Sequence, residues 1–282
     1  MEARSNDKRM CKLKTERMKI LNSALAIVLM ICLVTAQTAC TSSAARAGKS
    51  EQNSTVKQND KGGFVSIFDG KTLANWKGDT AFWSVKNGIL TGEETVATSP
   101  LLKANTFLIY SGGNPADFEL TAEYKISDEG NSGIQYRSEL VDGVPNGLGG
   151  YQMDIDGANT YTGQNYEERK RSIIAFRGQK VTLPVVTQSV QELAKNNVWS
   201  VSKVTGSLGS ADSLKSLIKN GWNTCRIVAK GNHLQHYING VLMCDVTDDD
   251  TANRKASGLI GLQLHAGHIM KIEFKNIQLK TL

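Results

Sequence analysis

Asn131-Ser132-Gly133-Ile134-Gln135-Tyr136-Arg137 and Gly150-Tyr151-Gln152-Met153-Asp154-Ile155-Asp156 are the two stretches that decide the fold. Each alternates apolar and polar residues with a period of two, which is typical of a β-strand with one face against a core. The polar face of the pair would gather a guanidinium, two carboxylates and several amides. This face is a candidate site for a polar ligand, and the alternative is a solvated outer face with an ion pair.

Short apolar runs recur along the chain from residue 64 onward, and turn sequences such as Lys86-Asn87-Gly88 and Asn239-Gly240 separate them. One short helix is expected at 212–219, with Asp212 as its N-cap. The remaining strands are predicted at 106–110, 118–126, 172–177, 180–186, 198–204, 222–229, 234–238, 241–246, 259–265 and 270–279. About a dozen short strands with almost no helix predict an all-β fold, an antiparallel β-sandwich whose first and last strands pair.

The first 40 residues indicate a signal peptide, so they are set apart from the domain. They hold seven of the 33 Lys and Arg residues and three of the 27 acids, which leaves 26 basic and 24 acidic residues elsewhere. The domain therefore has no nucleic-acid signature. An apolar run at 20–34, short for a membrane span, ends in small residues before Cys40.

Cys40 stands where a lipoprotein signal places its lipidated cysteine, although Gln37 occupies a position that is usually aliphatic. Plain secretion with cleavage after Ala45-Arg46-Ala47 is the alternative. Both readings predict that the protein is exported into a bacterial cell envelope, either to the periplasm or as an outer-membrane lipoprotein. Membrane attachment would be only through the N-terminal lipid. Residues 41–62 read as a flexible linker, and the domain is expected at 63–282.

Cys225 and Cys244 are the cysteines of the predicted domain. They lie on the first and third strands of a predicted meander, roughly 9.5 Å apart, whereas a disulfide needs Cα atoms within about 7 Å. Two buried free thiols are expected. Trp76 and Trp83 are expected in the core, and His233 and His236 as structural residues without an acidic partner.

Several motifs in order resemble one family, DUF1080, described as 3-keto-disaccharide hydrolases or 3-keto-glucoside 1,2-lyase and 3-keto-2-hydroxy-glucal hydratase domains. The match runs from about residue 63 to the C-terminus. The motifs are Phe68-Asp69-Gly70-Lys71-Thr72-Leu73 with Trp76, Trp83-x-Val85 with Gly88, Phe118-Glu119-Leu120, Asn131-Ser132-Gly133-Ile134 with Arg137, Trp222-Asn223, Asn239-Gly240, and Gly261-Leu262-Gln263-Leu264-His265.

The resemblance implies a concanavalin-like jelly roll, export, and a hydrolase or lyase acting on the glycosidic bonds of 3-keto sugars. Many members have Tyr-Glu in the central strand, whereas here Tyr151 is followed by Gln152. The resemblance therefore indicates the region of the site and does not single out one catalytic acid.

Cleavage of a 3-keto-glycoside needs a base for the C2 proton, a group that stabilises the enolate and a proton donor for the leaving oxygen. Asp154 or His265 is the candidate base, Arg137 the candidate enolate group, and Glu167 or Asp156 the candidate donor. The candidate substrate-binding residues are Gln135, Tyr151, Gln152, Glu168, Arg169 and Gln263.

Each role has an alternative. His265 could be structural, Arg137 could neutralise Asp154 or Asp156, and 167–171 could be a solvated charge run. The Cβ atoms of Asp154 and Asp156, two apart on a strand, lie roughly 6.5 Å apart, near the range of about 6.5–9.5 Å in inverting glycosidases. Direct hydrolysis therefore remains open.

A divalent cation held by Asp154, Asp156, Glu167 and His265 also remains open, although no cofactor or structural metal is specifically indicated. The competing function is a non-catalytic glycan-binding module of the lectin or laminin-G kind, and a structural adhesion domain is a third. A small carbohydrate is the expected partner under the first two readings.

Overall fold

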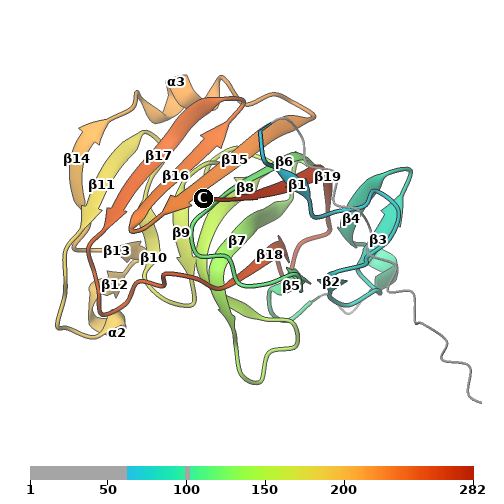
Figure 1. Ribbon diagram of the computed structural model, residues 1–282, viewed down its shortest axis with the longest axis horizontal. Coiled ribbons are helices and arrows are strands. Elements are labelled where there is room, and N and C mark those ends of the chain that lie inside the picture. Colours follow the sequence, from blue (N-terminus) through green and yellow to red (C-terminus); the bar gives the residue numbers. More distant parts are fainter. Residues whose placement is uncertain (1–61, 99–101) are drawn as a thin grey trace, which may run out of the picture. The chain divides into compact units, whose positions relative to one another are not determined.

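The computed structural model describes residues 62–98 and 102–282, and within them two large β-sheets pack face to face (Figure 1). The signal peptide, Cys40 and the linker predicted from the sequence lie outside the described residues. No helix in the described part of the chain is long and apolar enough to span a membrane.

The first sheet pairs its strands in a fixed order, and β1 (Val65–Ser66) pairs with β19 beside that path. The order is β14 (Lys203–Ser207), β11 (Gln179–Leu183), β17 (Val241–Asp248), β16 (His233–Ile238), β15 (Asn223–Lys230), β6 (Phe118–Ile126), β19 (Met270–Thr281), β4 (Ile89–Glu94) and β3 (Trp83–Lys86). The expected pairing of the first and last strands is confirmed, with Val65 opposite Leu279.

The second sheet carries the two stretches that open the sequence argument, as β7 and β8. Its order is β12 (Ala194–Lys195), β13 (Val198–Trp199), β10 (Ser172–Ala175), β9 (Asn165–Glu168), β8 (Leu148–Asp156), β7 (Asn131–Leu140), β18 (Leu259–Leu264), β5 (Thr106–Tyr110) and β2 (Trp76–Lys77). Because β7 and β8 are central, side chains from strands on both sides can reach their polar face.

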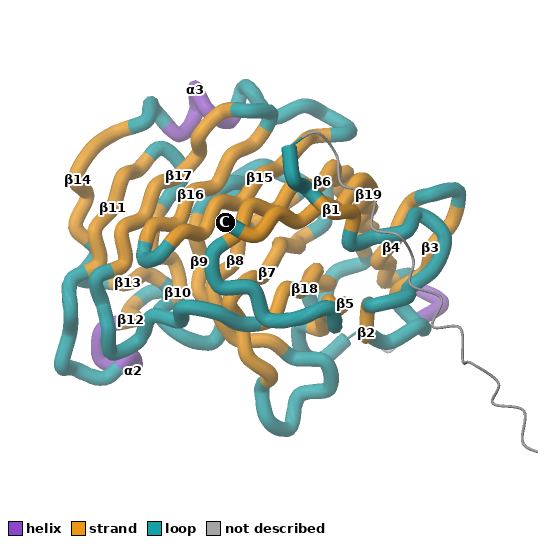
Figure 2. The backbone as a smooth tube through the Cα atoms, in the orientation of Figure 1, coloured by secondary structure: helices purple, strands orange, loops and turns teal. Residues whose placement is uncertain are grey.

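The all-β jelly-roll sandwich predicted from the sequence is confirmed, with differences of detail. Two strand pairs are parallel, β10 with β13 and β11 with β17. Helices in the described residues are confined to short segments, η1 (Val96–Thr98), α2 (Val190–Leu193) and α3 (Ala211–Lys215), and helices are purple in Figure 2. α3 is capped by Ser210 and not by the predicted Asp212.

The prediction of a single strand at 198–204 is wrong. A turn, in which the Ser202 amide donates to the Trp199 carbonyl at 3.2 Å, divides it into β13 and β14, which belong to different sheets. Trp199 remains buried in the core at 1 % exposure. Apolar residues stand on both sides of the turn, at Trp199, Val201 and Val204, so this short apolar run does not by itself reveal the turn.

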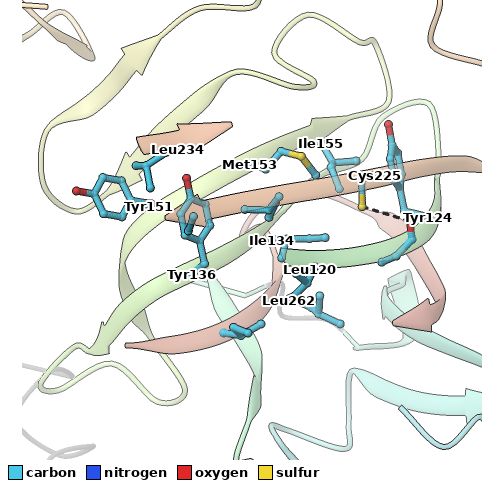
Figure 3. Close-up of a cluster of buried hydrophobic side chains, with 14 of the residues drawn as sticks. Leu120, Tyr124, Ile134, Tyr136, Tyr151, Met153, Ile155, Cys225, Leu234 and Leu262 are labelled. Atoms are coloured by element: carbon cyan, nitrogen blue, oxygen red, sulfur yellow. Dashed lines mark hydrogen bonds between the residues drawn. The ribbon is translucent and has the colours of Figure 1, made fainter. Parts of the chain in front are cut away.

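The core lies between the sheets and is built from their alternating apolar faces. Figure 3 shows Ile134, Tyr136, Met153 and Ile155 of the second sheet among side chains of the first. Cys225 and Cys244 are buried free thiols, as predicted. Trp76 and Trp83 are buried as well, at 7 % and 1 % exposure, so the core assignment is confirmed.

Candidate functional site

A polar pocket of about 210 Å³ opens on the face of the second sheet that points away from the core. Register pairs place Gln135 beside Gln152 and Gly133 beside Asp154 on β7 and β8, so these positions share one face. The pocket is lined by Asn105, Asn131, Gln152, Asp154, Tyr161, Gln164, Tyr166, Glu168, Ile173, Asn197, Gln263 and His265. Five of the sequence-predicted site residues therefore meet here, namely Gln152, Asp154, Glu168, Gln263 and His265.

Asp154 lies on the pocket wall and is 9 % exposed. Gln152 Nε2 donates to its Oδ1 at 2.8 Å, and Gln164 Nε2 donates to its Oδ2 at 2.6 Å. Burial raises the pKa of Asp154 to about 7; the two amide hydrogen bonds oppose that rise and the nearby Glu168 charge adds to it. The carboxyl group can thus both take up and release a proton near neutral pH.

Glu168 forms a second acidic group in the same pocket. Its carboxylate accepts from Asn105 Nδ2 at 3.3 and 3.5 Å and from Gln263 Nε2 at 3.4 Å. Burial raises its pKa, and Arg169, 3.9 Å away, opposes the rise. Gln263 Oε1 also accepts from Gln152 at 3.3 Å. A continuous chain of amides therefore links the two acids.

His265 lies at the β18 side of the pocket. Its Nδ1 is 2.9 Å from the Ala266 carbonyl oxygen, which can only accept, so Nδ1 carries the proton. Burial lowers the pKa of His265, and the neighbouring His268 lowers it further. The neutral ring consequently presents a lone pair at Nε2, which can accept a hydrogen bond or a proton.

Arg137, the predicted enolate group, does not line the pocket. The register of β7 and β8 shifts between Tyr136 and Glu139, and Arg137 adopts φ 46° within this irregularity. A bulge of this kind redirects the side chain that an unbroken alternation would place beside Gln135.

The Arg137 guanidinium is instead a buried structural group, 2 % exposed. Nε and Nη2 donate to the Ala116 carbonyl at 2.9 and 2.8 Å, and Nη1 donates to the Gly231 carbonyl at 2.7 Å and to that of Lys255 at 3.4 Å. Nη2 also pairs with Asp117 at 3.1 Å. It thereby joins three segments that are distant in sequence.

Replacing Arg137 with Met should lower the free energy of unfolding by about 2–4 kcal/mol, because several buried carbonyl groups lose their donors. The turnover of the folded fraction should stay close to that of the wild type. Denaturant unfolding and activity assays on folded protein measure both quantities. A large loss of turnover with unchanged stability would contradict the structural role.

Asp156 and Glu167, the predicted proton donors, do not line the pocket either. Asp156 accepts three backbone N–H groups, from Thr160, Tyr161 and Thr162, at 2.8–2.9 Å, so it fixes the loop that follows β8. Glu167 alternates with the pocket residues of β9 and therefore points toward the core, where it is fully buried.

Three of the predicted substrate-binding residues lie outside the pocket. Tyr151 faces the core, and its hydroxyl donates to Asp248 at 2.6 Å. Gln135 is on the pocket face but fully buried, and neither polar atom of its side chain has a partner within the described chain. Arg169 lies beside Glu168 at the surface, 37 % exposed, and does not line the pocket.

The remaining histidines differ partly from expectation. His233 Nε2 lies 2.6 Å from Asp245 Oδ1 on the outer face of the first sheet, so the statement that it lacks an acidic partner is wrong. His236 is fully buried, and burial lowers its pKa to about 4. It contacts the Tyr136 hydroxyl at 2.9 Å and the Gln164 carbonyl at 3.1 Å, which helps to hold Gln164 at the pocket.

Seven pocket residues were missed by sequence reasoning: Asn105, Asn131, Tyr161, Gln164, Tyr166, Ile173 and Asn197. Tyr166 could have been found by alternation, because it opposes Gln152 in register, and Asn131 because it precedes Gly133 by two on β7. The others come from loops or from strands too short to show a period.

The four residues proposed from sequence as cation ligands do not converge, since Glu167 faces the core and Asp156 is engaged by its loop. In the part of the chain that the structure describes, no group of three or more His, Cys, Asp or Glu side chains is arranged to hold a metal ion.

The chain belongs to the family described as 3-keto-alpha-glucoside-1,2-lyase-like domains, whose profile matches residues 63–280. This agrees with the resemblance drawn from the motifs and supports a carbohydrate-related function of the chain. A comparison with curated protein sequences finds no match.

Solved structures similar to this chain have low sequence identity to it. One candidate glycosyl hydrolase from Parabacteroides distasonis ATCC 8503 is 19 % identical, with 78 % of this chain and 99 % of that chain covered and a TM-score of 0.47. A second from the same organism is 16 % identical, with 78 % and 94 % covered and a TM-score of 0.46. The carbohydrate-binding module CBM66 from Bacillus subtilis is 12 % identical, with 73 % and 96 % covered and a TM-score of 0.45. Similarity at this level does not bear on function.

Proposed function

We propose that this protein is an exported enzyme that cleaves the glycosidic bond of 3-keto-glycosides by elimination followed by hydration. The observation that carries the proposal is Asp154, a carboxyl group with a pKa of about 7 on the wall of a pocket rich in amides. A carboxyl group of this kind is a suitable base at neutral pH, and the family supplies the class of substrate.

The C2 hydrogen of a 3-keto sugar is acidic because the adjacent C3 carbonyl stabilises the carbanion. Removal of this proton leaves an electron pair that forms the C2–C3 double bond of an enolate. The enolate then expels the C1 substituent, which takes up a proton at its oxygen, and an enone with a C1–C2 double bond remains. Water adds to C1 and a proton returns to C2, so the net reaction is hydrolysis.

Asp154 takes the C2 proton in the first half and returns it in the second. Gln152 and Gln164 hold its two oxygens, so the carboxyl group cannot rotate away from the substrate. Glu168 gives its proton to the leaving oxygen and later accepts one from the attacking water; burial raises its pKa and so favours the protonated form that this role needs.

The enolate oxygen is stabilised by amide N–H groups, which replace the guanidinium expected from the sequence. The amide N–H groups of Asn105 and Gln263 point toward Glu168 at 3.3–3.5 Å, and the Ala266 backbone N–H, which donates to Asn105 Oδ1 at 3.0 Å, fixes the Asn105 amide in this orientation. The side chain of Asn131 lines the same pocket. His265 accepts a substrate hydroxyl at Nε2.

Turnover of a purified protein starting at residue 41 tests the proposal. The substrates are a 3-keto-disaccharide and methyl 3-keto-glucoside, and the enone intermediate is followed by its ultraviolet absorption. Parallel assays with a chelator and with added divalent cations test whether turnover needs a cation, a question that the sequence left open. Glycan binding without turnover of any 3-keto-glycoside would identify a binding module. The absence of both turnover and glycan binding would favour an adhesion domain.

The pH dependence follows from the raised pKa of Asp154. Because the base must be ionised, kcat/KM should rise about tenfold per pH unit below pH 7, and it should fall again at higher pH as Glu168, the proton donor, becomes ionised. A pH series of initial rates with methyl 3-keto-glucoside measures this profile. A rising limb centred near pH 4 would contradict Asp154 as the base.

A further inference from the structure

Gln135 is a fully buried glutamine on the pocket face of the second sheet, and its amide is unpaired. Neither Nε2 nor Oε1 has a partner within the described chain. An unpaired buried amide is costly to the fold, so its presence needs an explanation. The residues directly opposite Gln135 are Gln152 on β8 and Gly261 on β18. Because glycine has no side chain, Gln152 is the polar neighbour in direct register.

Gln152 also has an unpaired atom. Its Nε2 faces two acceptors, Asp154 Oδ1 at 2.8 Å and Gln263 Oε1 at 3.3 Å. An ionised carboxyl group can only accept, so the nitrogen of the Gln152 amide must face Asp154 and the oxygen must face away from it. This Oε1 atom is buried and has no partner among the described residues.

Packing fixes where the Gln152 amide lies but not which of its two ends faces Asp154. A Cβ atom added at Gly133 would come within 2.6 Å of Gln152 Cγ and Cδ and 2.8 Å of Nε2, so the side chain lies directly over this glycine. The nitrogen and oxygen of an amide are nearly the same size, and the terminal torsion of glutamine is broad. Hydrogen bonds must therefore decide which end faces the carboxyl group.

The unpaired atoms of the two glutamines are complementary, since Gln135 Nε2 is a donor and Gln152 Oε1 an acceptor. The Cβ atoms of directly opposed residues lie about 4.5–5.5 Å apart, so rotation of the terminal torsions can bring the two amides together. Hydrogen bonds of a catalytic site often tighten only when substrate binds. We propose that Gln135 is a positioning residue for the base: in the substrate complex it donates to Gln152 Oε1 and so keeps the Gln152 N–H group directed at Asp154. This inference rests on the proposed function.

The proposed bond acts on the protonation of Asp154. The Gln152 hydrogen bond lowers the pKa of Asp154 and thus opposes the effect of burial. Without the Gln135 donor, Gln152 can turn its oxygen toward Asp154, where it accepts from the protonated carboxyl group and favours that form. The pKa of Asp154 would then rise, and the base would be ionised only at higher pH. A residue that merely held the strands together would not change this pKa.

The other titratable groups around Asp154 remain in place when Gln135 is replaced. Asp156 lies on the same strand, Glu168 and Tyr166 come from β9, Tyr161 and His265 line the pocket from loops, and Cys244 acts from β17. A change in the pH profile on replacement of Gln135 therefore reports on the amide of this residue.

Gln135→Met removes the amide and keeps the length of the side chain. The rising, acid side of the kcat/KM profile for methyl 3-keto-glucoside should move up by about one pH unit. The variant should consequently lose about tenfold in kcat/KM at pH 5 and only about twofold at pH 8. Its Tm should be unchanged or higher, because the replaced amide is buried without a partner in the described chain.

Gln235→Met is the matched control. Gln235 also donates to an aspartate, with Nε2 3.0 Å from Asp245 Oδ2, but on the outer face of the first sheet. Its pH profile should be that of the wild type. In a Gln152→Met background, Gln135→Met should cause no further shift, because the amide through which Gln135 acts is absent.

A ¹³C NMR titration of the Asp154 carboxyl group, assigned with Asp154→Asn, measures the same shift without turnover. An unshifted titration in Gln135→Met would overturn the positioning role, and so would a shift of equal size in the Gln152→Met background. If the wild type is active, either result overturns the role of Gln135 alone. A wild-type protein inactive on methyl 3-keto-glucoside would overturn the proposed reaction and, with it, the role of Gln135 in that reaction.

Discussion

Asp154→Asn should reduce kcat by about 10²- to 10⁴-fold, the usual contribution of a positioned base. The amide keeps the size of the carboxylate but cannot accept the C2 proton, and Gln152 or Gln164 must turn its amide oxygen toward the new NH2 group. Binding of the unreactive product 3-keto-glucose should change little, because the pocket keeps its shape. Initial rates and calorimetric binding on the same preparation measure the two effects separately.

The fold should tolerate this substitution. The pKa of Asp154 is raised above its ordinary value, so the ionised form is disfavoured in the folded protein relative to the unfolded chain. That cost grows as the pH rises from about 4 through about 7, and a neutral amide avoids it. Thermal unfolding at pH 8 should therefore show an unchanged or higher Tm.

Asp245→Asn is the matched control, because Asp245 pairs with His233 on the outer face of the other sheet. It should keep full turnover. An Asp154→Asn protein with wild-type turnover would leave His265 as the base, and His265→Ala would then be the inactivating variant.

Arg171→Met should have the largest effect on stability, about 3–5 kcal/mol in the free energy of unfolding. Arg171 is fully buried and is surrounded by Glu167 at 2.5 Å, Asp248 at 2.6 Å and Asp250 at 3.4 Å. Without the guanidinium, three carboxyl groups would remain buried with no counter-charge. Denaturant unfolding measures the loss, and Arg226→Met, which removes an exposed arginine, is the control.

A second substitution distinguishes lost charge compensation from lost packing. Burial raises the pKa of Glu167, and its Oε1 has no partner within the described chain. Glu167→Gln in the Arg171→Met background should therefore recover part of the stability. A double variant no more stable than Arg171→Met alone would show that packing, and not charge, accounts for the loss.

This buried cluster also explains how β9 contributes side chains to the pocket lining. Glu167 is anchored on the core side of the strand, and its neighbours Tyr166 and Glu168 consequently face outward at defined positions. The sequence alone left open that the charged residues at 167–171 form a solvated segment. In the structure, Glu167 lies in the core, Glu168 lines the pocket and Arg169 lies at the surface.

The sequence by itself determined the architecture and the central part of the site. Period-two alternation identified β6 with the bounds observed, and it placed Gln152, Asp154, Gln263 and His265 together. Alternation is a local property: it follows from the pleat of a strand and needs no knowledge of the partner strand.

Only the tertiary structure decided which polar residues reach the pocket. The bulge in β7 directs Arg137 away, the loop bonds engage Asp156, and the buried guanidinium of Arg171 draws Glu167 into the core. Tyr161 and Asn197 enter from loops that have no period. Bulges, loop anchors and buried ion pairs depend on contacts between residues far apart in the chain, and a local pattern contains no information about such contacts.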